Sequence, residues 1–386
     1  MLVYSRAFRR LPEANLSEVL MYRLSTLRLP FLLLSFLSLV ASSAMAKPKP
    51  VAAQPCTAAA PECTEWVQLA GGPARSMIYR TYALNALNPN VRRALIMVHG
   101  TNRNPDHYFR TAAGAAFLAN ALGDTIVIAP AFFSSDKGCN DKLQENEVSW
   151  SCRGDSWRSG GVSISNSNLT SFDFMDELLH RLADKKFFPN LNAIVIAGHS
   201  AGGQFVARYE MAGRVADTLG VAVSYAIANP SSYAWPDASR PLPVDDGAPE
   251  SAIAAWKSEA PHANFSYGPF DATKAEKYNL WPYGLVGRSS GYTAKSTDEE
   301  LLKQLASRNA TYLISQVDTL PLGGFDGSLN AMAQGATRRA RGEAFVKYTN
   351  EKYGAKGKIL IIPECGHNDR CVYTTDAALS VIFPPL

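Results

Sequence analysis

Ser200 lies at the centre of GHSAG (residues 198–202), which matches the pattern G-x-S-x-G. The pattern ends an apolar run at 192–200 and opens a segment with helical period. A serine in this context sits on a tight strand-to-helix turn, where small neighbours keep their side chains clear and the hydroxyl stays exposed. We therefore expect Ser200 to act as a nucleophile. The alternative is a structural turn with no chemical role.

The base is expected to be a histidine, because a serine hydroxyl is a weak nucleophile that needs an oriented proton acceptor. Two histidines follow Ser200 in the chain, His262 and His367. His367 comes directly after the apolar run 356–364, so it reaches the same edge of a parallel sheet as Ser200. His262 lies in an irregular segment and is more typical of a surface residue. We predict that His367 is the base.

The acid that orients the base is expected between the serine and the histidine, because serine turns of this kind use that chain order. Asp318 is the first carboxylate after the start of the apolar run 309–317, and it would reach the same edge of the sheet. Asp326 is the alternative, although its surroundings, FDGS, are typical of a helix cap. We predict that Asp318 is the acid.

Two backbone N–H groups are expected to bind the negative oxygen of a tetrahedral intermediate. One donor is expected at Ala201, directly after the serine. The other is expected from VHGTNRN (98–104), where Gly100 lets the backbone approach closely and Thr101 is the candidate donor. His99 in this segment is interpreted as a structural residue that fixes the loop.

The elements that must position these residues alternate along the chain. Near-continuous Val/Ile/Leu runs indicate strands that are covered on both faces, and they span 93–100, 124–132, 192–200, 220–228, 309–317 and 356–364. Segments with helical period cover 171–187, 201–220 and 327–354, and Ser328 is a candidate cap. The alternation predicts an α/β fold with a mostly parallel central sheet that is flanked by helices.

One catalytic domain is expected from residue 76 to residue 386, preceded by an Ala/Pro/Gly-rich arm at 47–75. Residues 231–295 are rich in Pro, Gly and aromatic residues and lack clear periodicity. A segment of this length without periodicity is usually functional or disordered. Because it lies between two expected core strands, we interpret it as a cap or lid insertion.

The first 46 residues have the pattern of a secretory signal peptide. Arg23 and Arg28 precede the apolar run LPFLLLSFLSLVASS, which ends at Ala44-Met45-Ala46 and is short for a membrane span. The basic stretch before this run is unusually long, so Met21 is an alternative start. We expect an exported protein, periplasmic or secreted, with no stable membrane anchor after cleavage. The alternative is that the segment stays uncleaved as a membrane anchor.

The charge of the chain gives no reason to expect nucleic acid or an anionic membrane as a partner. The formal net charge is +4, and residues 1–46 contribute +3 through five Arg and two Glu. The remaining residues therefore carry a net charge of about +1. With 47% hydrophobic and 19% charged residues, the composition is that of an ordinary globular protein.

All six cysteines follow the expected cleavage point and form three local pairs, Cys56–Cys63, Cys139–Cys152 and Cys365–Cys371. An even number of cysteines in an exported chain is typical of disulfides, and local pairing is our prediction. The alternative is a metal site at Cys365, His367 and Cys371, but it lacks an obvious fourth ligand and needs reduced thiols. We therefore expect no metal and no cofactor.

Four motifs resemble the α/β-hydrolase superfamily, namely VHGTNRN (98–104), AGHSAGG (197–203), SQVDT (315–319) and CGHND (365–369). Exported esterases and polyhydroxybutyrate-depolymerase-like enzymes are the nearest type. The resemblance covers roughly residues 75–386 and implies about eight strands and cofactor-free acyl transfer. It also implies Ser200 as nucleophile, Asp318 as acid, His367 as base, and Thr101 and Ala201 as oxyanion donors. Unlike extracellular polymer depolymerases, the chain has no separate substrate-binding module after the catalytic domain, which speaks against solid polymer as a substrate.

Trp157, Phe132 and Trp281 are candidates for the wall of a substrate pocket, and each could instead be a core residue. The expected function is hydrolysis of a small or oligomeric carboxylic ester through a serine, histidine and aspartate triad. An amidase, peptidase or acyltransferase would use the same triad. A non-catalytic binding protein with this fold is a further alternative, which the presence of all three candidate residues disfavours.

Overall fold

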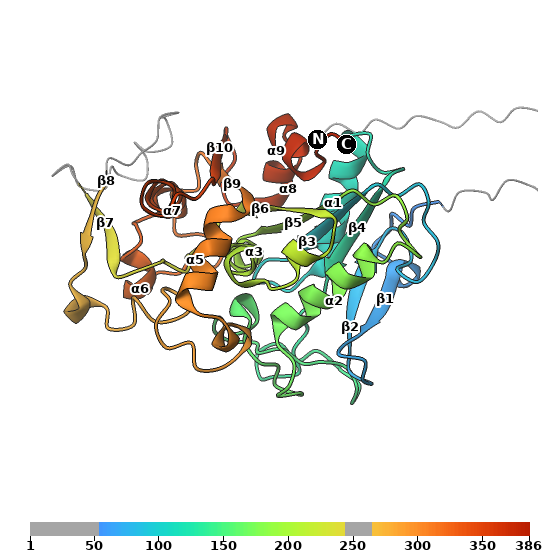
Figure 1. The fold of residues 1–386 in the computed structure, drawn as a ribbon, viewed down its shortest axis with the longest axis horizontal. Coiled ribbons are helices and arrows are strands. Elements are labelled where there is room, and N and C mark those ends of the chain that lie inside the picture. The colour runs from blue at the N-terminus through green and yellow to red at the C-terminus, as the bar shows by residue number, and fades with distance from the viewer. Residues whose placement is uncertain (1–53, 244–264) are drawn as a thin grey trace, which may run out of the picture. The chain divides into compact units, whose positions relative to one another are not determined.

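An eight-stranded sheet forms the centre of the computed structural model, which describes residues 54–243 and 265–386 (Figure 1). The strands lie in the order β1-β2-β4-β3-β5-β6-β9-β10. Their bounds are β1 Thr64–Gln68, β2 Arg75–Arg80, β3 Arg93–Val98, β4 Thr125–Pro130, β5 Ala193–His199, β6 Ala222–Ala228, β9 Asn309–Ser315 and β10 Lys358–Ile362. β1 and β2 pair antiparallel, and all pairs among the other six strands are parallel. The expected mostly parallel α/β sheet is confirmed.

Helices cover both faces of the sheet and enclose two apolar cores. Ala94, Ile96 and Val98 of β3 point into one core, and Leu95 and Met97 point into the other. The first core is covered by α2 (Ser171–Ala183), α3 (Ala201–Ala212), α5 (Asp298–Ser307) and α7 (Arg338–Tyr353), and the second by α1 (Pro105–Leu118), α8 (Asp369–Tyr373) and α9 (Asp376–Ile382). Because both faces are buried, the strands carry apolar residues at successive positions, which is why they were visible in the sequence.

All three expected helices end earlier or break. The segment 171–187 is α-helical only as far as Ala183. The segment 201–220 is α-helical only as far as Ala212. The segment 327–354 divides into α6 (Leu329–Met332) and α7, because Gly335 between them has φ +138°, a conformation that residues with a side chain rarely adopt. Ser328 caps α6 as expected, and its hydroxyl oxygen accepts a hydrogen bond from a backbone N–H of the first turn at 3.3 Å.

The arm expected at 47–75 contains a strand of the sheet. β1 pairs with β2 from Thr64 opposite Tyr79 to Gln68 opposite Arg75. Only Val67 of β1 is buried, so this edge strand carries no apolar run that could have been recognised. The sheet therefore begins before residue 76. The expected signal peptide (1–46) and residues 47–53 lie outside the described residues.

The described part of segment 231–295 contains a two-stranded antiparallel ribbon, β7 (Ser239–Pro243) and β8 (Phe265–Pro269). The beginning of the segment belongs to the core, because Tyr233 and Trp235 are buried and stack on aromatic side chains of α7. A cap or lid role for this segment remains a prediction. His262 lies outside the described residues.

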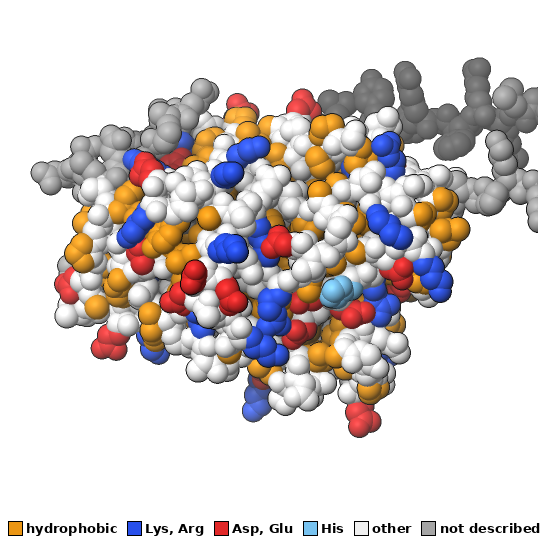
Figure 2. Space-filling view, in the orientation of Figure 1, with side chains coloured by type: hydrophobic (Ala, Val, Ile, Leu, Met, Phe, Trp, Pro, Cys, Tyr) orange, Lys and Arg blue, Asp and Glu red, His pale blue; other side chains and the backbone are white. Residues whose placement is uncertain are grey.

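Figure 2 shows Lys and Arg side chains interspersed with Asp and Glu side chains over the face drawn. This mixture agrees with the small formal net charge of the chain. None of the helices in the described ranges is both long enough and apolar enough to cross a membrane.

Candidate active site

Ser200 lies on a sharp turn between β5 and α3. Its backbone angles are φ 60° and ψ −117°, which residues with a side chain rarely adopt. Two glycines make the turn possible. A Cβ on Gly198 would lie 2.4 Å from the carbonyl oxygen of Gly202, and a Cβ on Gly202 would lie 2.2 Å from that of Val98. Both distances are far below a van der Waals contact, so packing requires the small residues of the motif.

His367 links Ser200 to Asp318 through two hydrogen bonds. Its Nε2 lies 2.9 Å from Ser200 Oγ, and its Nδ1 lies 2.7 Å from Asp318 Oδ2. The site is shielded, because Ser200 is 6% exposed, Asp318 2%, and the His367 side chain 10%. The three residues selected from the sequence therefore meet in one hydrogen-bonded chain. In this geometry an imidazole can accept the serine proton while a carboxylate fixes its tautomer.

The ends of three parallel strands bring these residues together. Ser200 follows β5, Asp318 follows β9, and His367 follows β10. Parallel strands end at one edge of a sheet, so residues far apart in the chain meet there. The strand order in the sheet places β5 and β9 on either side of β6, with β10 beyond β9.

The loop that carries His367 is held at two further points. The Cys365–Cys371 disulfide closes it on one side. Asp369 ties it to α1, because its carboxylate accepts a hydrogen bond from His107 Nε2 at 3.0 Å and another from Thr111 Oγ1 at 2.9 Å. These contacts restrict where the His367 ring can point.

Arg338 of α7 is a residue of the site that the sequence pattern did not reveal. Its side chain is fully buried, and Nη1 lies 3.3 Å from Asp318 Oδ1. The same guanidinium donates to Ser231 Oγ at 2.8 Å and to the carbonyl of Gly323 at 3.0 Å. Burial lowers the pKa of Arg338, and the Asp318 charge opposes this effect. The only signal in the sequence is the basic run TRRAR (337–341), which is equally typical of a solvated helix face.

The candidate oxyanion donors lie next to the serine and after β3. Ala201 opens α3, where the first backbone N–H groups have no partner within the helix. His99 fixes the turn before Thr101, because Nδ1–H donates to the Gly100 carbonyl at 2.9 Å and Nε2 accepts from Phe132 N–H at 3.1 Å. Burial lowers the pKa of His99 to about 4, which keeps the ring neutral and its Nε2 an acceptor. The donor roles of Ala201 and Thr101 remain predictions.

His199 packs against the candidate base. The ring centroids of His199 and His367 are 4.5 Å apart, and the Tyr108 hydroxyl lies 3.3 Å from His199 Nδ1. Burial holds the pKa of His199 well below its usual range, and the neighbouring His367 acts in the same direction. His199 therefore presents a neutral ring to His367.

Two of the three aromatic residues expected in a substrate pocket belong to the core instead. Phe132 is 0% exposed and Trp157 is 2% exposed, and their rings stack with centroids 5.1 Å apart. Large aromatic side chains serve cores and pockets equally well, so residue type alone could not decide. Trp281 is half-buried and donates from Nε1 to the Ser159 carbonyl at 3.1 Å. Contact between Trp281 and substrate remains a prediction.

The structure contains the three disulfides predicted from local pairing, Cys56–Cys63, Cys139–Cys152 and Cys365–Cys371. The bond between Cys365 and Cys371 removes the thiolates that a zinc site beside His367 would need. Within 54–243 and 265–386, no group of His, Cys, Asp and Glu side chains is arranged to hold a metal ion.

Asp326, the alternative acid, supports a turn. Its Oδ2 accepts a hydrogen bond from the Tyr283 hydroxyl at 2.7 Å, and its Oδ1 accepts one from Ser328 N–H at 3.0 Å. These contacts fix the start of α6, and the hydrogen bond to His367 comes from Asp318 instead.

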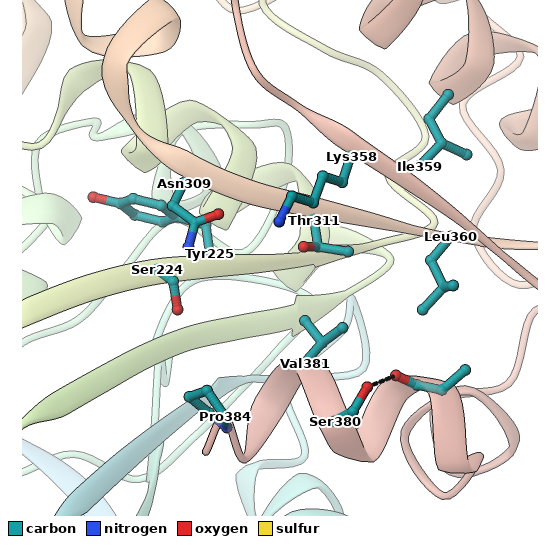
Figure 3. A pocket seen from close by; sticks show the side chains of 11 residues that line it. Ser224, Tyr225, Asn309, Thr311, Lys358, Ile359, Leu360, Ser380, Val381 and Pro384 are labelled. Atoms are coloured by element: carbon teal, nitrogen blue, oxygen red, sulfur yellow. Dashed lines mark hydrogen bonds between the residues drawn. The ribbon is translucent and has the colours of Figure 1, made fainter. Parts of the chain in front are cut away.

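A pocket of about 400 Å³ opens at the other edge of the sheet (Figure 3). It is lined by residues near the starts of β6, β9 and β10 and by residues of α9 and its C-terminal end, namely Ser224, Tyr225, Asn309, Thr311, Lys358, Ile359, Leu360, Ala377, Ser380, Val381 and Pro384. Figure 3 shows α9 beneath the strands, with Val381 pointing up toward Thr311. Because Ser200, Asp318 and His367 follow the carboxyl ends of β5, β9 and β10, the pocket at the strand starts is separate from the candidate triad.

The fold and the matched residues place the chain in a family. A model of the alpha/beta hydrolase family matches residues 95–380, and the chain belongs to this family. Among solved structures, the chain is similar to LpqC, a poly(3-hydroxybutyrate) depolymerase from Bordetella parapertussis, with a TM-score of 0.53 and 18% identity over 81% of this chain and 85% of that chain. It is also similar to poly(aspartic acid) hydrolase-1 from Sphingomonas sp. KT-1, with a TM-score of 0.54 and 20% identity over 83% and 97% of the two chains. A comparison with curated proteins finds no match. At these identities the likeness to solved structures concerns the fold alone.

Proposed function

We propose that the protein is an exported serine hydrolase that cleaves carboxylic esters through Ser200, His367 and Asp318. The observation that carries the proposal is the hydrogen-bonded chain of the three side chains, with contacts of 2.9 Å and 2.7 Å on the two ring nitrogens of His367. Membership of the alpha/beta hydrolase family supports the same reaction class. Acyl transfer by such a triad needs no cofactor.

The reaction has two steps. Ser200 Oγ attacks the acyl carbon while His367 Nε2 takes its proton, and the alcohol leaves with that proton, so that an acyl-enzyme forms. A water molecule then gives a proton to His367 and attacks the acyl carbon. The bond from that carbon to Ser200 Oγ breaks, His367 returns the proton to Oγ, and the acid is released. Asp318 keeps Nδ1 protonated, and the N–H groups of Thr101 and Ala201 bind the negative oxygen of each intermediate.

An amidase or peptidase is the second candidate, because the same triad serves amide bonds. The names of the two similar structures do not favour one bond type over the other. One is named for poly(3-hydroxybutyrate), a polyester, and the other for poly(aspartic acid). An acyltransferase would differ only in the acceptor of the acyl group. A non-catalytic binding protein is disfavoured, because a protein without catalysis has no need to keep Asp318, His367 and Ser200 in one hydrogen-bonded chain.

Export is supported by the three disulfides, because such bonds persist in oxidising compartments. The signal-like pattern of residues 1–46 gives the route. Expression of the full chain followed by N-terminal sequencing tests this part of the proposal. A mature N-terminus close to Lys47 in an extracytoplasmic fraction is expected, and retention of residues 1–46 in the cytoplasm would contradict it.

A substrate panel tests the reaction itself. The mature chain is assayed with p-nitrophenyl esters and with the matched p-nitroanilides, and Ser200→Ala is the control. We expect ester hydrolysis that falls by roughly 10⁴-fold or more in the variant. Anilide cleavage at a comparable rate would favour the amidase. Full ester hydrolysis in Ser200→Ala would contradict the proposed function.

A further inference from the structure

We propose that an exposed apolar strip beside His367 binds the alcohol part of the ester, and that this alcohol is therefore aliphatic. The apolar strip consists of Leu320, Leu322, Leu329 and Met332. The inference rests on the ester hydrolysis proposed above and adds the chemical class of one half of the substrate.

The strip gathers large apolar side chains at the surface of one short segment. Leu320 is 47% exposed, Leu322 60%, Leu329 65% and Met332 39%. Leu329 and Met332 are three positions apart on α6, so they share one side of the helix, whereas Ala331 is buried. Single exposed apolar residues are ordinary, but several together expose surface that water disfavours and usually mark a binding site.

Backbone contacts place Gly323 and Gly324, which follow Leu322, against the candidate catalytic groups. A Cβ on Gly323 would lie 2.7 Å from His367 Cδ2, and a Cβ on Gly324 would lie 3.0 Å from Thr101 Cγ2. The Gly323 carbonyl also accepts a hydrogen bond from buried Arg338 at 3.0 Å. The backbone next to Leu322 is thus packed directly on the base and on the candidate oxyanion loop.

The charge of the segment favours an uncharged partner. Between residues 319 and 335 the only ionisable residue is Asp326. Both of its carboxylate oxygens accept hydrogen bonds, one from the Tyr283 hydroxyl and one from Ser328 N–H. Tyr283 belongs to a neighbouring turn that exposes two more apolar side chains, Leu280 at 38% and Val286 at 52%. The segment therefore offers contact to aliphatic groups. Arg338 and Arg341, which donate to the carbonyls of Gly323 and Asp326, are buried and present no charge to an anionic substrate at this surface.

The chemistry of the triad assigns the strip to the alcohol side. When the bond between the acyl carbon and the ester oxygen breaks, His367 Nε2 gives its proton to that oxygen, so the oxygen must lie within hydrogen-bond distance of Nε2. The group attached to the oxygen therefore leaves the site past the His367 ring. The segment meets this ring at Gly323, directly after Leu322 of the strip.

Two substrate series test the assignment. In the first, the alcohol is lengthened at a constant acyl group, from ethyl to hexyl acetate. In the second, the acyl group is lengthened at a constant alcohol, from ethyl acetate to ethyl hexanoate. Both series are measured on the mature chain and on its double variant, which carries Leu320→Ser and Leu322→Ser together. The matched control is Leu118→Ser, which removes a leucine that is 57% exposed on α1. Near-ultraviolet circular dichroism checks that each variant is folded.

The ratio of kcat/KM for hexyl acetate to that for ethyl acetate should fall about tenfold in the double variant, because aliphatic contact area is lost. The ratio within the acyl series should stay within twofold, and Leu118→Ser should change neither ratio. If Ser200-dependent hydrolysis is present but the double variant keeps both ratios, or loses only the acyl ratio, the inference is wrong and the proposed function stands. If no ester is hydrolysed through Ser200, both fail.

Discussion

Arg338 reaches Asp318 from α7, and its Nη1 lies 3.3 Å from Oδ1 while both side chains are almost fully shielded from water. The other oxygen of the same carboxylate accepts the hydrogen bond from His367 at 2.7 Å. A carboxylate with a partner on each oxygen has one orientation, and the hydrogen bond to the histidine depends on that orientation. We therefore expect Arg338 to act on the candidate site through Asp318, as a positioning residue.

Arg338→Gln should lower kcat by about 10- to 100-fold with a smaller change in KM, because Asp318 loses the contact that fixes it. The variant should also unfold more easily, since a buried charge that loses its partner costs about 3–5 kcal/mol. Steady-state kinetics and urea denaturation measure the two effects. Arg338→Lys, which keeps the charge, should recover part of kcat.

The matched control for this prediction is Arg341→Gln. Arg341 is also fully buried on α7, but it donates to backbone carbonyls, including those of Gly335 and Asp326, and not to Asp318. The Arg341→Gln variant should be less stable, but its folded fraction should retain most of kcat. Equal loss of kcat in the two variants would mean that Arg338 contributes only to folding.

Gly202→Ala should prevent the turn at Ser200 from forming. The added methyl group would meet the Val98 carbonyl oxygen at 2.2 Å and the His99 carbonyl oxygen at 2.7 Å, and neither backbone can move easily inside the sheet. We expect a loss of several kcal/mol in the free energy of unfolding, measured by denaturation, and little active protein. Gly114→Ala in α1 is the control, because its Cβ would meet nothing within 4 Å. That variant should be neutral or slightly more stable.

Removal of the Cys365–Cys371 bridge should lower the thermal tolerance of activity and the turnover number, without release of a metal. The bridge closes a loop of six residues in sequence separation, which corresponds to about 2 kcal/mol in the chain-entropy model. Cys365→Ser with Cys371→Ser is compared with Cys56→Ser with Cys63→Ser. The second pair should cost stability but leave kcat at 25 °C unchanged. Unchanged kinetics and melting temperature in the first pair would show that the bridge is incidental.

His99 should make part of the stability depend on pH. Burial lowers its pKa from 6.5 to about 4, so the unfolded chain binds more protons between these values. The contribution of neutral His99 is fully present above pH 6.5 and is lost as the pH falls toward 4. Between pH 7.5 and pH 5 the resulting loss in the free energy of unfolding is about 2 kcal/mol. Glu210, whose pKa burial raises to about 8, acts in the opposite direction, so a variant is needed to isolate His99.

The difference in free energy of unfolding between the wild-type chain and His99→Gln should therefore shrink by about 2 kcal/mol from pH 7.5 to pH 5. Urea denaturation at the two pH values measures it. A difference that stays constant, or that grows toward acid pH, would contradict the assignment of a neutral buried His99.

Much of the fold could be predicted because its six parallel strands are buried on both faces and appear as apolar runs. The same runs explain why Ser200, Asp318 and His367 could be placed at one edge, since each directly follows such a run or lies at its end. The edge strand at Thr64–Gln68 could not be predicted in this way, because one face and one edge remain exposed and only Val67 is buried. The break between α6 and α7 depends on a single glycine in an unusual conformation.

Residues that contact the candidate site from distant parts of the chain could not be predicted from the sequence. The run at 337–341 has three arginines, and only the fold shows that Arg338 points at Asp318 while Arg341 points at the turn before α6. From the sequence, Phe132 and Trp157 could belong either to a substrate pocket or to the core. Their burial in the structure shows that they belong to the core. Composition and periodicity report local preferences, whereas these contacts join segments that are far apart in the chain.

Covalent labelling with a fluorophosphonate tests the central claim most directly, because the reagent reacts with a serine only when a neighbouring base activates it. The folded mature chain is incubated with the reagent, and digested peptides are examined by mass spectrometry. We predict one label per chain, on Ser200, that is lost in Ser200→Ala and strongly slowed in His367→Ala. A folded wild-type chain that leaves Ser200 unlabelled would contradict the account.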